Sequence, residues 1–229
     1  MDIQQKEEII FLGIDDAGRG PVIGPMVLAG CLADSKTIEE FKKIGVRDSK
    51  QLTQKRREFL EKIIKEKSEG FEVEVISADE IDKKNAEGIK LNELEAISSA
   101  NIINKLNKGG KKIKVILDCP SVSINKWGDF LKTHIENLSN LEITCEHKAD
   151  RNHAIVSAAS ILAKCRREEE MSELKKTYGK EIGSGYGSDP MTKKFLEQNA
   201  GSHNHSKLFR KTWSNWKTAN QNAGQKKLL

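Results

Sequence analysis

The chain has 229 residues, of which 37% are hydrophobic and 32% are charged, and its formal net charge is +5. This balance excludes a disordered protein and fits one sizeable α/β domain with its own core. No apolar run of about eighteen residues is present, and the N-terminus lacks the layout of a signal peptide, so we expect a cytoplasmic protein without a membrane partner. The four cysteines lie far apart, which favours free thiols over a zinc knuckle or disulfides.

The first part of the chain alternates apolar segments with glycine-rich turns. Residues 9–14 form a short apolar run, which is typical of a buried strand, and residues 26–32 predict a second strand. The charged segment 53–67 is typical of an exposed amphipathic helix. Apolar and acidic residues alternate over 71–75, which predicts a third strand with one wet face.

The second part alternates helices with strands. Helical spacing predicts a helix over 91–106, and a β-branched run predicts a strand over 113–117. A helix over 127–138, a short strand over 141–145 and an Ala- and Ser-rich helix over 154–165 follow. This order predicts a mixed sheet covered by helices.

The C-terminal region is basic, because no acidic residue follows Glu197 and six basic residues do. Such a region suits a polyanionic partner, although a basic tail is more often a solvated surface. Phe209, Trp213 and Trp216 are expected on one helix face, where an aromatic stripe usually packs into the core.

Acidic residues occur at or just beyond the ends of three predicted strands: Asp15 with Asp16, then Asp118, then Asp150. Carboxylates that converge at a sheet edge repel one another unless a cation neutralises them. Oxygen ligands favour Mg²⁺ or Mn²⁺ over zinc, and two such ions support hydrolysis of a phosphodiester. Separate turn-forming or helix-capping aspartates remain the alternative, especially for Asp118 and Asp150.

Five ordered segments between residues 9 and 216 resemble type 2 ribonucleases H (ribonuclease HII) of the archaeal kind. The segments are residues 13–25 (GIDDAGRGPVIGP), 47–52 (RDSKQL), 117–118 (LD), 148–164 (KAD with AASILAK) and 183–190 (GSGY with SDP).

The resemblance implies an RNase H-like mixed sheet flanked by helices, with a helical C-terminal extension. We therefore expect a catalytic domain over 1–180 and a substrate-binding loop with a basic helical extension over 181–229. The implied activity is endonucleolytic hydrolysis of the phosphodiester 5′ to ribonucleotides, in RNA/DNA hybrids and at single ribonucleotides embedded in duplex DNA. Two-metal-ion catalysis with Mg²⁺ or Mn²⁺ would leave 3′-hydroxyl and 5′-phosphate ends.

The same resemblance implies roles for individual residues. The catalytic, metal-binding carboxylates would be Asp15, Asp16, Asp118 and Asp150. Glycines allow a close backbone approach to the 2′-hydroxyl that separates RNA from DNA. This approach would be made by Gly18, Arg19 and Gly20. A tyrosine, Tyr186, would stack on the sugar next to the RNA–DNA junction. Phosphate contacts would come from Lys50 and Lys164.

Two positions depart from the family pattern. Asp16 stands where the family usually has Glu, so the second carboxylate is one methylene shorter. Gly187 stands where a proline often follows the tyrosine, a change that would loosen the loop.

Three other interpretations stay open. A related nuclease or phosphotransferase would use the same carboxylates on another substrate, and a catalytically impaired protein would bind nucleic acid without cleaving it. Residues 225–229 (QKKLL) begin like a peptide that binds a sliding clamp, but they lack the aromatic pair that would fill the clamp's pocket. A sliding clamp is therefore a hypothetical partner through the C-terminal tail.

Overall fold

The structure is a computed structural model that describes residues 9–47, 52–201 and 207–226, with side chains to residue 224. Its contacts divide the chain into two compact units. The first contains the described residues of 1–17, 28–74 and 95–165, and the second contains those of 18–27, 75–94 and 166–229.

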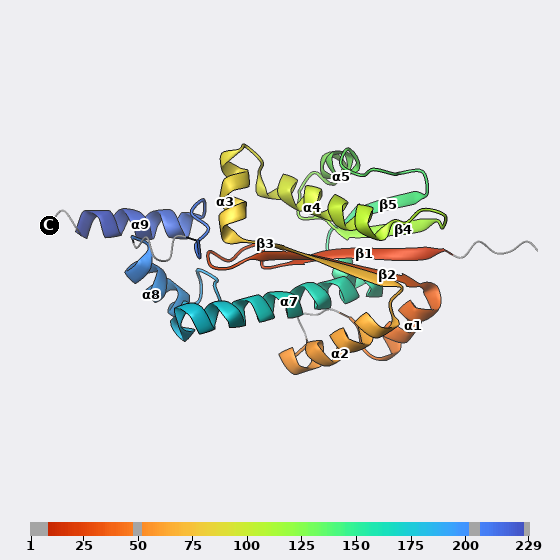
Figure 1. Cartoon of the computed structure of the whole chain (residues 1–229), viewed down its shortest axis with the longest axis horizontal. Helices are drawn as coiled ribbons and strands as arrows, with labels where there is room; N and C mark the ends of the chain where they lie inside the picture. The colour runs from red at the N-terminus through yellow and green to blue at the C-terminus, as the bar shows by residue number, and fades with distance from the viewer. Residues whose placement is uncertain (1–8, 48–51, 202–206, 227–229) are drawn as a thin grey trace, which may run out of the picture. The chain divides into compact units, whose positions relative to one another are not determined.

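Strands and helices alternate along most of the chain (Figure 1). In chain order they are β1 (Ile10–Ala17), β2 (Met26–Asp34), α1 (Ser35–Lys43), α2 (Gln54–Lys67), β3 (Gly70–Ile76), α3 (Ala78–Ala86), α4 (Leu91–Leu106), β4 (Ile113–Asp118), α5 (Ile124–Lys132), β5 (Leu141–Glu146), α6 (Ala149–Asn152), α7 (Ala154–Tyr178), the 3₁₀ helix η2 (Lys180–Ile182), α8 (Pro190–Asn199) and α9 (Ser214–Lys226).

The five strands form one mixed sheet in the order β3-β2-β1-β4-β5. The central strand β1 pairs in parallel with β4, and β4 pairs in parallel with β5. The register places Ile14 opposite Leu117 and Leu117 opposite Cys145. A central parallel strand is covered on both faces, which explains the nearly continuous apolar sequence of β1.

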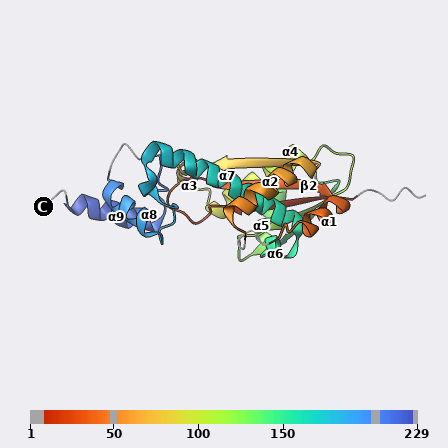
Figure 2. The same ribbon diagram turned by 90° about the horizontal axis from the view of Figure 1, so that it is seen from below.

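Helices cover both faces of the sheet in the first unit. Figure 1 shows α4 and α5 on one side of the sheet, and α1, α2 and the first part of α7 on the other. In Figure 2, which is seen from below, α1, α2 and α7 lie in front of the sheet. Close packing requires glycine in the strands: a Cβ on Gly13 would overlap the backbone of Ile155, and one on Gly30 would overlap Ile102. The predicted mixed sheet flanked by helices is confirmed.

The second unit has its own apolar core, and the aromatic residues of the C-terminal region belong to it. Phe209 is 1% exposed and pairs with Ile23 in an isolated β-bridge, while Trp213 and Trp216 pack against the cluster from its edge. The predicted core role is thus confirmed. The prediction that these three aromatic residues share one helix face is wrong, because α9 begins only at Ser214.

Several boundaries differ from the sequence-based expectation. Strand β1 continues through Ala17, so Asp15 and Asp16 lie inside it, and α7 runs on to Tyr178. Helices α1 and α3 were not predicted. The cysteines are free thiols as expected, although Cys145 is only half-buried. None of the described helices is both long and apolar enough to span a bilayer.

Candidate active site

The two central parallel strands bring Asp15 and Asp118 to neighbouring positions. Ile14 lies opposite Leu117 in the β1–β4 register, and each aspartate is the next residue of its strand. Asp15 is 6% exposed and Asp118 is half-buried. Parallel pairing thus sets two carboxylates side by side at one end of the sheet.

The electrostatics of Asp15 show that carboxylates gather around it. Burial, then the neighbouring carboxylates of Asp16 and Asp118, raise the pKa of Asp15 well above its ordinary value. Hydrogen bonds from the Ser160 hydroxyl and from the Asp16 backbone N–H, at 2.8 Å, oppose the rise. A buried carboxylate among like charges is a position that a cation would stabilise.

A tight turn brings Asp150 to the same strand end. One carboxylate oxygen of Asp118 accepts the backbone N–H of Ala149 at 2.9 Å, and Asp150 is the next residue, 1% exposed. Lys148 before it has a left-handed backbone with a φ of 60°. This conformation costs a non-glycine residue about 1 kcal/mol, and here it turns the chain back onto β4.

The group is not a closed coordination shell. Asp15 shares with Gly13 the face of β1 that packs on α7, and alternation along a strand directs Asp16 to the opposite face. Within residues 9–47, 52–201 and 207–226, no three His, Cys, Asp or Glu side chains form a ready-made metal site. The carboxylates therefore lie within electrostatic range of one another without converging on one point.

Lys164, one of the two lysines predicted to contact phosphates, lies near the carboxylates. Lys164 is half-buried on α7, one helical turn after Ser160, so it lies on the helix face that reaches Asp15. Lys50 lies outside the described residues.

The Gly-Arg-Gly segment follows β1 in a loop of the second unit. Gly18 has a φ of 80°, and a Cβ there would overlap the side chain of Arg167, so only glycine fits. The guanidinium of Arg19 donates to the side-chain oxygen of Asn92 at the start of α4. We call residues 18–25 the glycine loop.

Tyr186 lies close to the glycine loop. Its ring is 43% exposed, and a Cβ on Gly20 would be 3.8 Å from the ring. The Arg167 guanidinium lies 5.4 Å from the ring centroid. Burial lowers the pKa of Arg167. The backbone N–H of Val22 donates to the Gly185 carbonyl at 2.9 Å, which ties the two loops together.

Gly187 packs closely against α9. A Cβ at this position would overlap the amide of Asn215 in the first turn of α9. The departure from the usual proline thus coincides with a contact between the tyrosine-bearing loop and α9.

A buried arginine holds the glycine loop from the C-terminal side. Arg210 is 0% exposed, and its guanidinium donates to the carbonyls of Gly24 (2.9 Å), Arg19 (2.8 Å) and Gly18 (2.7 Å). Trp213, whose ring lies 5.0 Å from this guanidinium, donates to the Gly20 carbonyl at 3.0 Å. Each of the three carbonyls of the Gly-Arg-Gly segment thereby accepts a hydrogen bond.

Sequence reasoning missed three residues of this arrangement: Ser160, Arg167 and Arg210. Ser160 was quoted only as part of a motif, and Arg210 only as one charge of a basic region. An arginine between two aromatic residues, Phe209 and Trp213, was the available signal that the side chain is buried rather than solvated.

Several solved ribonucleases H share this fold. The ribonuclease H2 from Pyrococcus horikoshii OT3 matches with a TM-score of 0.82 and 36% identity over 93% of this chain and 97% of that one. RNase HII in the PCNA:RNase HII complex from Archaeoglobus fulgidus matches with a TM-score of 0.79 and 35% identity, covering 90% of this chain and 95% of that one. Bst-RNase HIII in complex with Mn²⁺ shares the fold at 20% identity, with a TM-score of 0.76 over 96% of this chain and 72% of that one. The protein therefore has an RNase H-like fold with carboxylates at its central strands.

Sequence comparison narrows this class. The family model described as Ribonuclease HII matches residues 12–216. Ribonuclease HII from Methanocaldococcus jannaschii is 41% identical over 219 residues, which cover 92% of this chain and 93% of that protein. Ribonuclease HII from Pyrococcus furiosus is 42% identical over 202 residues, covering 88% of this chain and 87% of that protein. The chain belongs to the ribonuclease HII family, and it is a ribonuclease H.

Proposed function

We propose that this ribonuclease H hydrolyses the phosphodiester 5′ to ribonucleotides in RNA/DNA hybrids and at single ribonucleotides embedded in duplex DNA, leaving 3′-hydroxyl and 5′-phosphate ends. The observation that carries the proposal is the buried carboxylate of Asp15, whose pKa is raised by burial and by the carboxylates of Asp16 and Asp118. Excess negative charge at the ends of central strands needs a cation, and a metal-dependent phosphodiesterase uses that cation for chemistry.

The donor set fits two hard divalent cations. Asp15, Asp16, Asp118 and Asp150 offer oxygen ligands, which suit Mg²⁺ or Mn²⁺. Such ions, when bound, supply positive charge that activates the attacking water and stabilises the leaving oxygen. The chain's own part is to hold the carboxylates ready: Ser160 and the Asp16 backbone N–H orient Asp15, and the Ala149 backbone N–H orients Asp118.

Ribose recognition is assigned to the glycine loop and its neighbours. The backbone of Gly18, Arg19 and Gly20, of which Gly20 is exposed, would meet the 2′-hydroxyl, and the 43% exposed Tyr186 would stack on the sugar next to the junction. The contact between Gly20 and Tyr186 supports this assignment, because one nucleotide can touch both. We further propose that residues 181–229 serve substrate binding, and that Lys50 and Lys164 contact phosphates.

The testing experiment is incubation with duplex DNA that contains one ribonucleotide, in Mg²⁺ and separately in Mn²⁺. We expect a single incision 5′ to the ribonucleotide with a 5′-phosphate on the downstream fragment, because the carboxylate group and the ribose-reading loop follow one another directly in the chain. Denaturing electrophoresis beside an all-DNA duplex reads the result. Absence of incision with either ion would sink the proposal, and cleavage of the all-DNA control would remove its ribose specificity.

A sliding clamp is a second proposed partner. Support comes from the matching RNase HII that was solved as a PCNA:RNase HII complex, together with the clamp-like beginning of residues 225–229. The side chains of this tail lie outside the described residues. We expect a purified archaeal clamp to retain the full chain on a column and to release a chain ending at Gly224; equal retention of both would assign any binding to another surface.

A further inference from the structure

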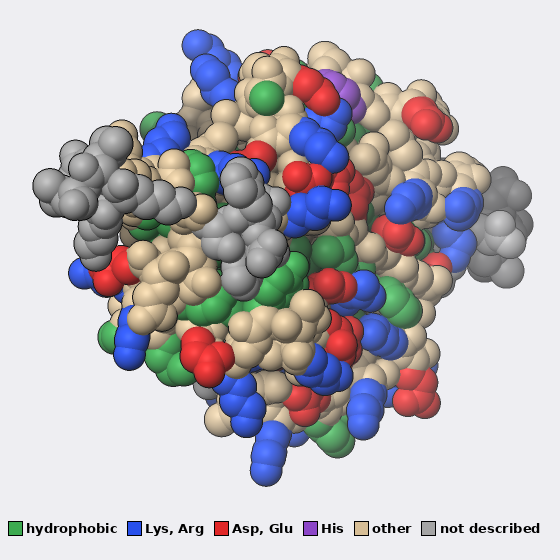
Figure 3. All heavy atoms as spheres, turned by 60° about the vertical axis from the view of Figure 1, so that its left-hand side comes forward, with side chains coloured by type: hydrophobic (Ala, Val, Ile, Leu, Met, Phe, Trp, Pro, Cys, Tyr) green, Lys and Arg blue, Asp and Glu red, His purple; other side chains and the backbone are tan. Residues whose placement is uncertain are grey.

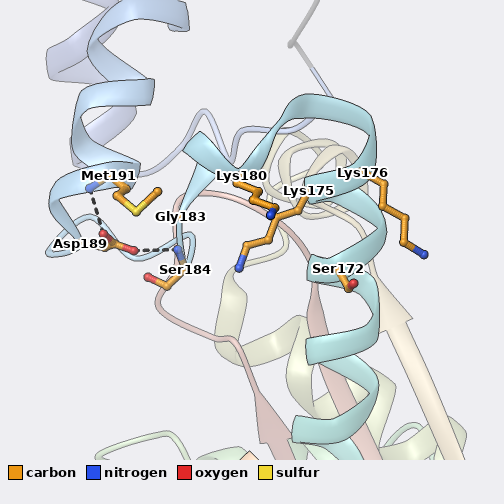
Figure 4. A pocket seen from close by; sticks show the side chains of 8 residues that line it. All are labelled: Ser172, Lys175, Lys176, Lys180, Gly183, Ser184, Asp189 and Met191. Atoms are coloured by element: carbon orange, nitrogen blue, oxygen red, sulfur yellow. Dashed lines mark hydrogen bonds between the residues drawn. The ribbon is translucent and has the colours of Figure 1, made fainter.

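The second unit contains a pocket that none of the roles above uses. Its volume is about 700 Å³. It lies between the end of α7, η2 and the loop before α8 (Figure 4). The residues that line it are Ser172, Lys175, Lys176, Lys180, Gly183, Ser184, Asp189 and Met191.

Two lysines bring unbalanced positive charge to this pocket. Figure 4 shows the amino groups of Lys175 and Lys180 directed toward the same space beside Ser184, whereas that of Lys176 points away. Lys176 is paired with Glu173 at 2.6 Å. In the ranges that the structure describes, neither Lys175 nor Lys180 forms an ion pair. Two ammonium groups that approach without a carboxylate between them favour an anion there.

The one carboxylate that lines the pocket is engaged elsewhere. One oxygen of Asp189 accepts the backbone N–H of Ser184 at 2.7 Å, and the other accepts that of Met191 at 2.9 Å. Asp189 thus caps α8 and fixes the loop, and its charge is balanced by backbone N–H groups. The Ser184 side chain also hydrogen-bonds to Asp189, so the hydroxyl is part of this same loop-fixing arrangement.

Lysine alone does not mark this place as special. In Figure 3, Lys and Arg side chains are spread over the visible face and Asp and Glu side chains lie among them. Charge of mixed sign scattered in this way is the ordinary solvated surface of a protein. The pocket differs because its two converging lysines have no acidic partner among the described residues and lie in a concave site.

The pocket lies next to the proposed junction-binding loop. Ser184 lines the pocket, and Tyr186 is two residues further along the same loop, so their Cα atoms are at most about 7 Å apart. We propose that Lys175 and Lys180 bind one backbone phosphate of the nucleic acid that flanks the nucleotide stacked on Tyr186. The proposal rests on the proposed function, and it adds a subsite that anchors the duplex rather than a catalytic group.

The test combines a double variant with single neutral linkages in the substrate. Lys175→Gln with Lys180→Gln is compared with the wild type on duplexes in which one phosphate near the ribonucleotide is replaced by methylphosphonate. Affinity is measured by fluorescence anisotropy without divalent ions, so that no cleavage occurs. We expect one linkage that weakens the wild type severalfold and leaves the variant unaffected, because both changes remove the same contact.

Salt dependence gives an independent readout. Loss of one phosphate contact reduces the slope of log K against log salt by about 0.9, so the wild type should weaken about 3.5-fold more than the variant between 50 and 200 mM salt. Lys176→Gln is the matched control, and its slope should equal that of the wild type.

The outcomes separate this proposal from the proposed function. Additive effects at every linkage, or an unchanged salt slope, would overturn the phosphate subsite even if the wild type still incises the ribonucleotide substrate. Binding of inorganic phosphate without coupling to any linkage would also overturn it. If the wild type fails to incise the substrate, the proposed function is wrong. The phosphate subsite would still be supported if one methylphosphonate linkage weakens binding by the wild type but not by the double variant.

Discussion

Asp118→Asn is expected to abolish cleavage, with kcat lowered by at least about a hundredfold, the upper end for loss of a group that only orients a metal ligand. Asp118 accepts the Ala149 backbone N–H, and the amide oxygen of asparagine can accept the same bond. The variant should therefore keep the turn that precedes Asp150 while losing one negative charge from the group. Single-turnover incision measures the first effect, and anisotropy without divalent ions should show nearly unchanged duplex binding.

A thermal readout tests the metal site apart from activity. Mn²⁺ should raise the Tm of the wild type, since a ligand that binds only the folded state stabilises it, and it should raise that of the variant much less. Without metal the variant should be at least as stable as the wild type, because Asp15 loses a like-charged neighbour. Asp129→Asn is the matched control: its side chain is 77% exposed on α5. Wild-type cleavage by Asp118→Asn would remove this residue from the site.

The carboxylate group was predictable because its cause is local. An apolar, β-branched run predicts a buried strand, and parallel strands end at the same sheet edge, so the positions of Asp15 and Asp118 follow from two short segments. The left-handed Lys148 that brings Asp150 back to β4 leaves no pattern in sequence, since lysine has no preference for that conformation. Asp150 was singled out because it follows a predicted strand, and the family resemblance then implied its metal-binding role.

The support of the glycine loop was not predictable from the sequence. Arg210 and Gly24 are 186 positions apart, and no periodicity connects residues so distant in the chain. A basic residue in a basic region looks like a solvated charge until its burial is known. The pocket that contains Lys175 and Lys180 was not predictable for the same reason. The two lysines come together only because η2 returns beside the end of α7, and no sequence pattern indicates that turn.

Arg210→Met should be the most damaging change in the second unit. It removes three charge-assisted hydrogen bonds and leaves the carbonyls of Gly18, Arg19 and Gly24 without this donor in a buried place. Each such bond contributes about 1.5–3 kcal/mol, and because the three act together we expect the free energy of unfolding to fall by about 3–5 kcal/mol. Urea denaturation measures this. Arg166→Met is the matched control, since Arg166 is exposed and pairs with Glu170 at 2.7 Å on the surface of α7.

The effect on activity should exceed what lost stability explains. If Arg210 fixes the carbonyls around Arg19, the loop proposed to read the ribose shifts when the guanidinium is removed, and a shift of about 1 Å can cost about a hundredfold in rate. Arg210→Lys should recover little, because an ammonium cannot supply the planar fork that meets three carbonyls. In Arg210→Ala, millimolar guanidinium should fill the vacated space and restore incision, an outcome that unfolding alone could not produce. If the folded variant keeps the wild-type rate and the wild-type preference for a ribonucleotide over DNA, Arg210 has no part in positioning the loop.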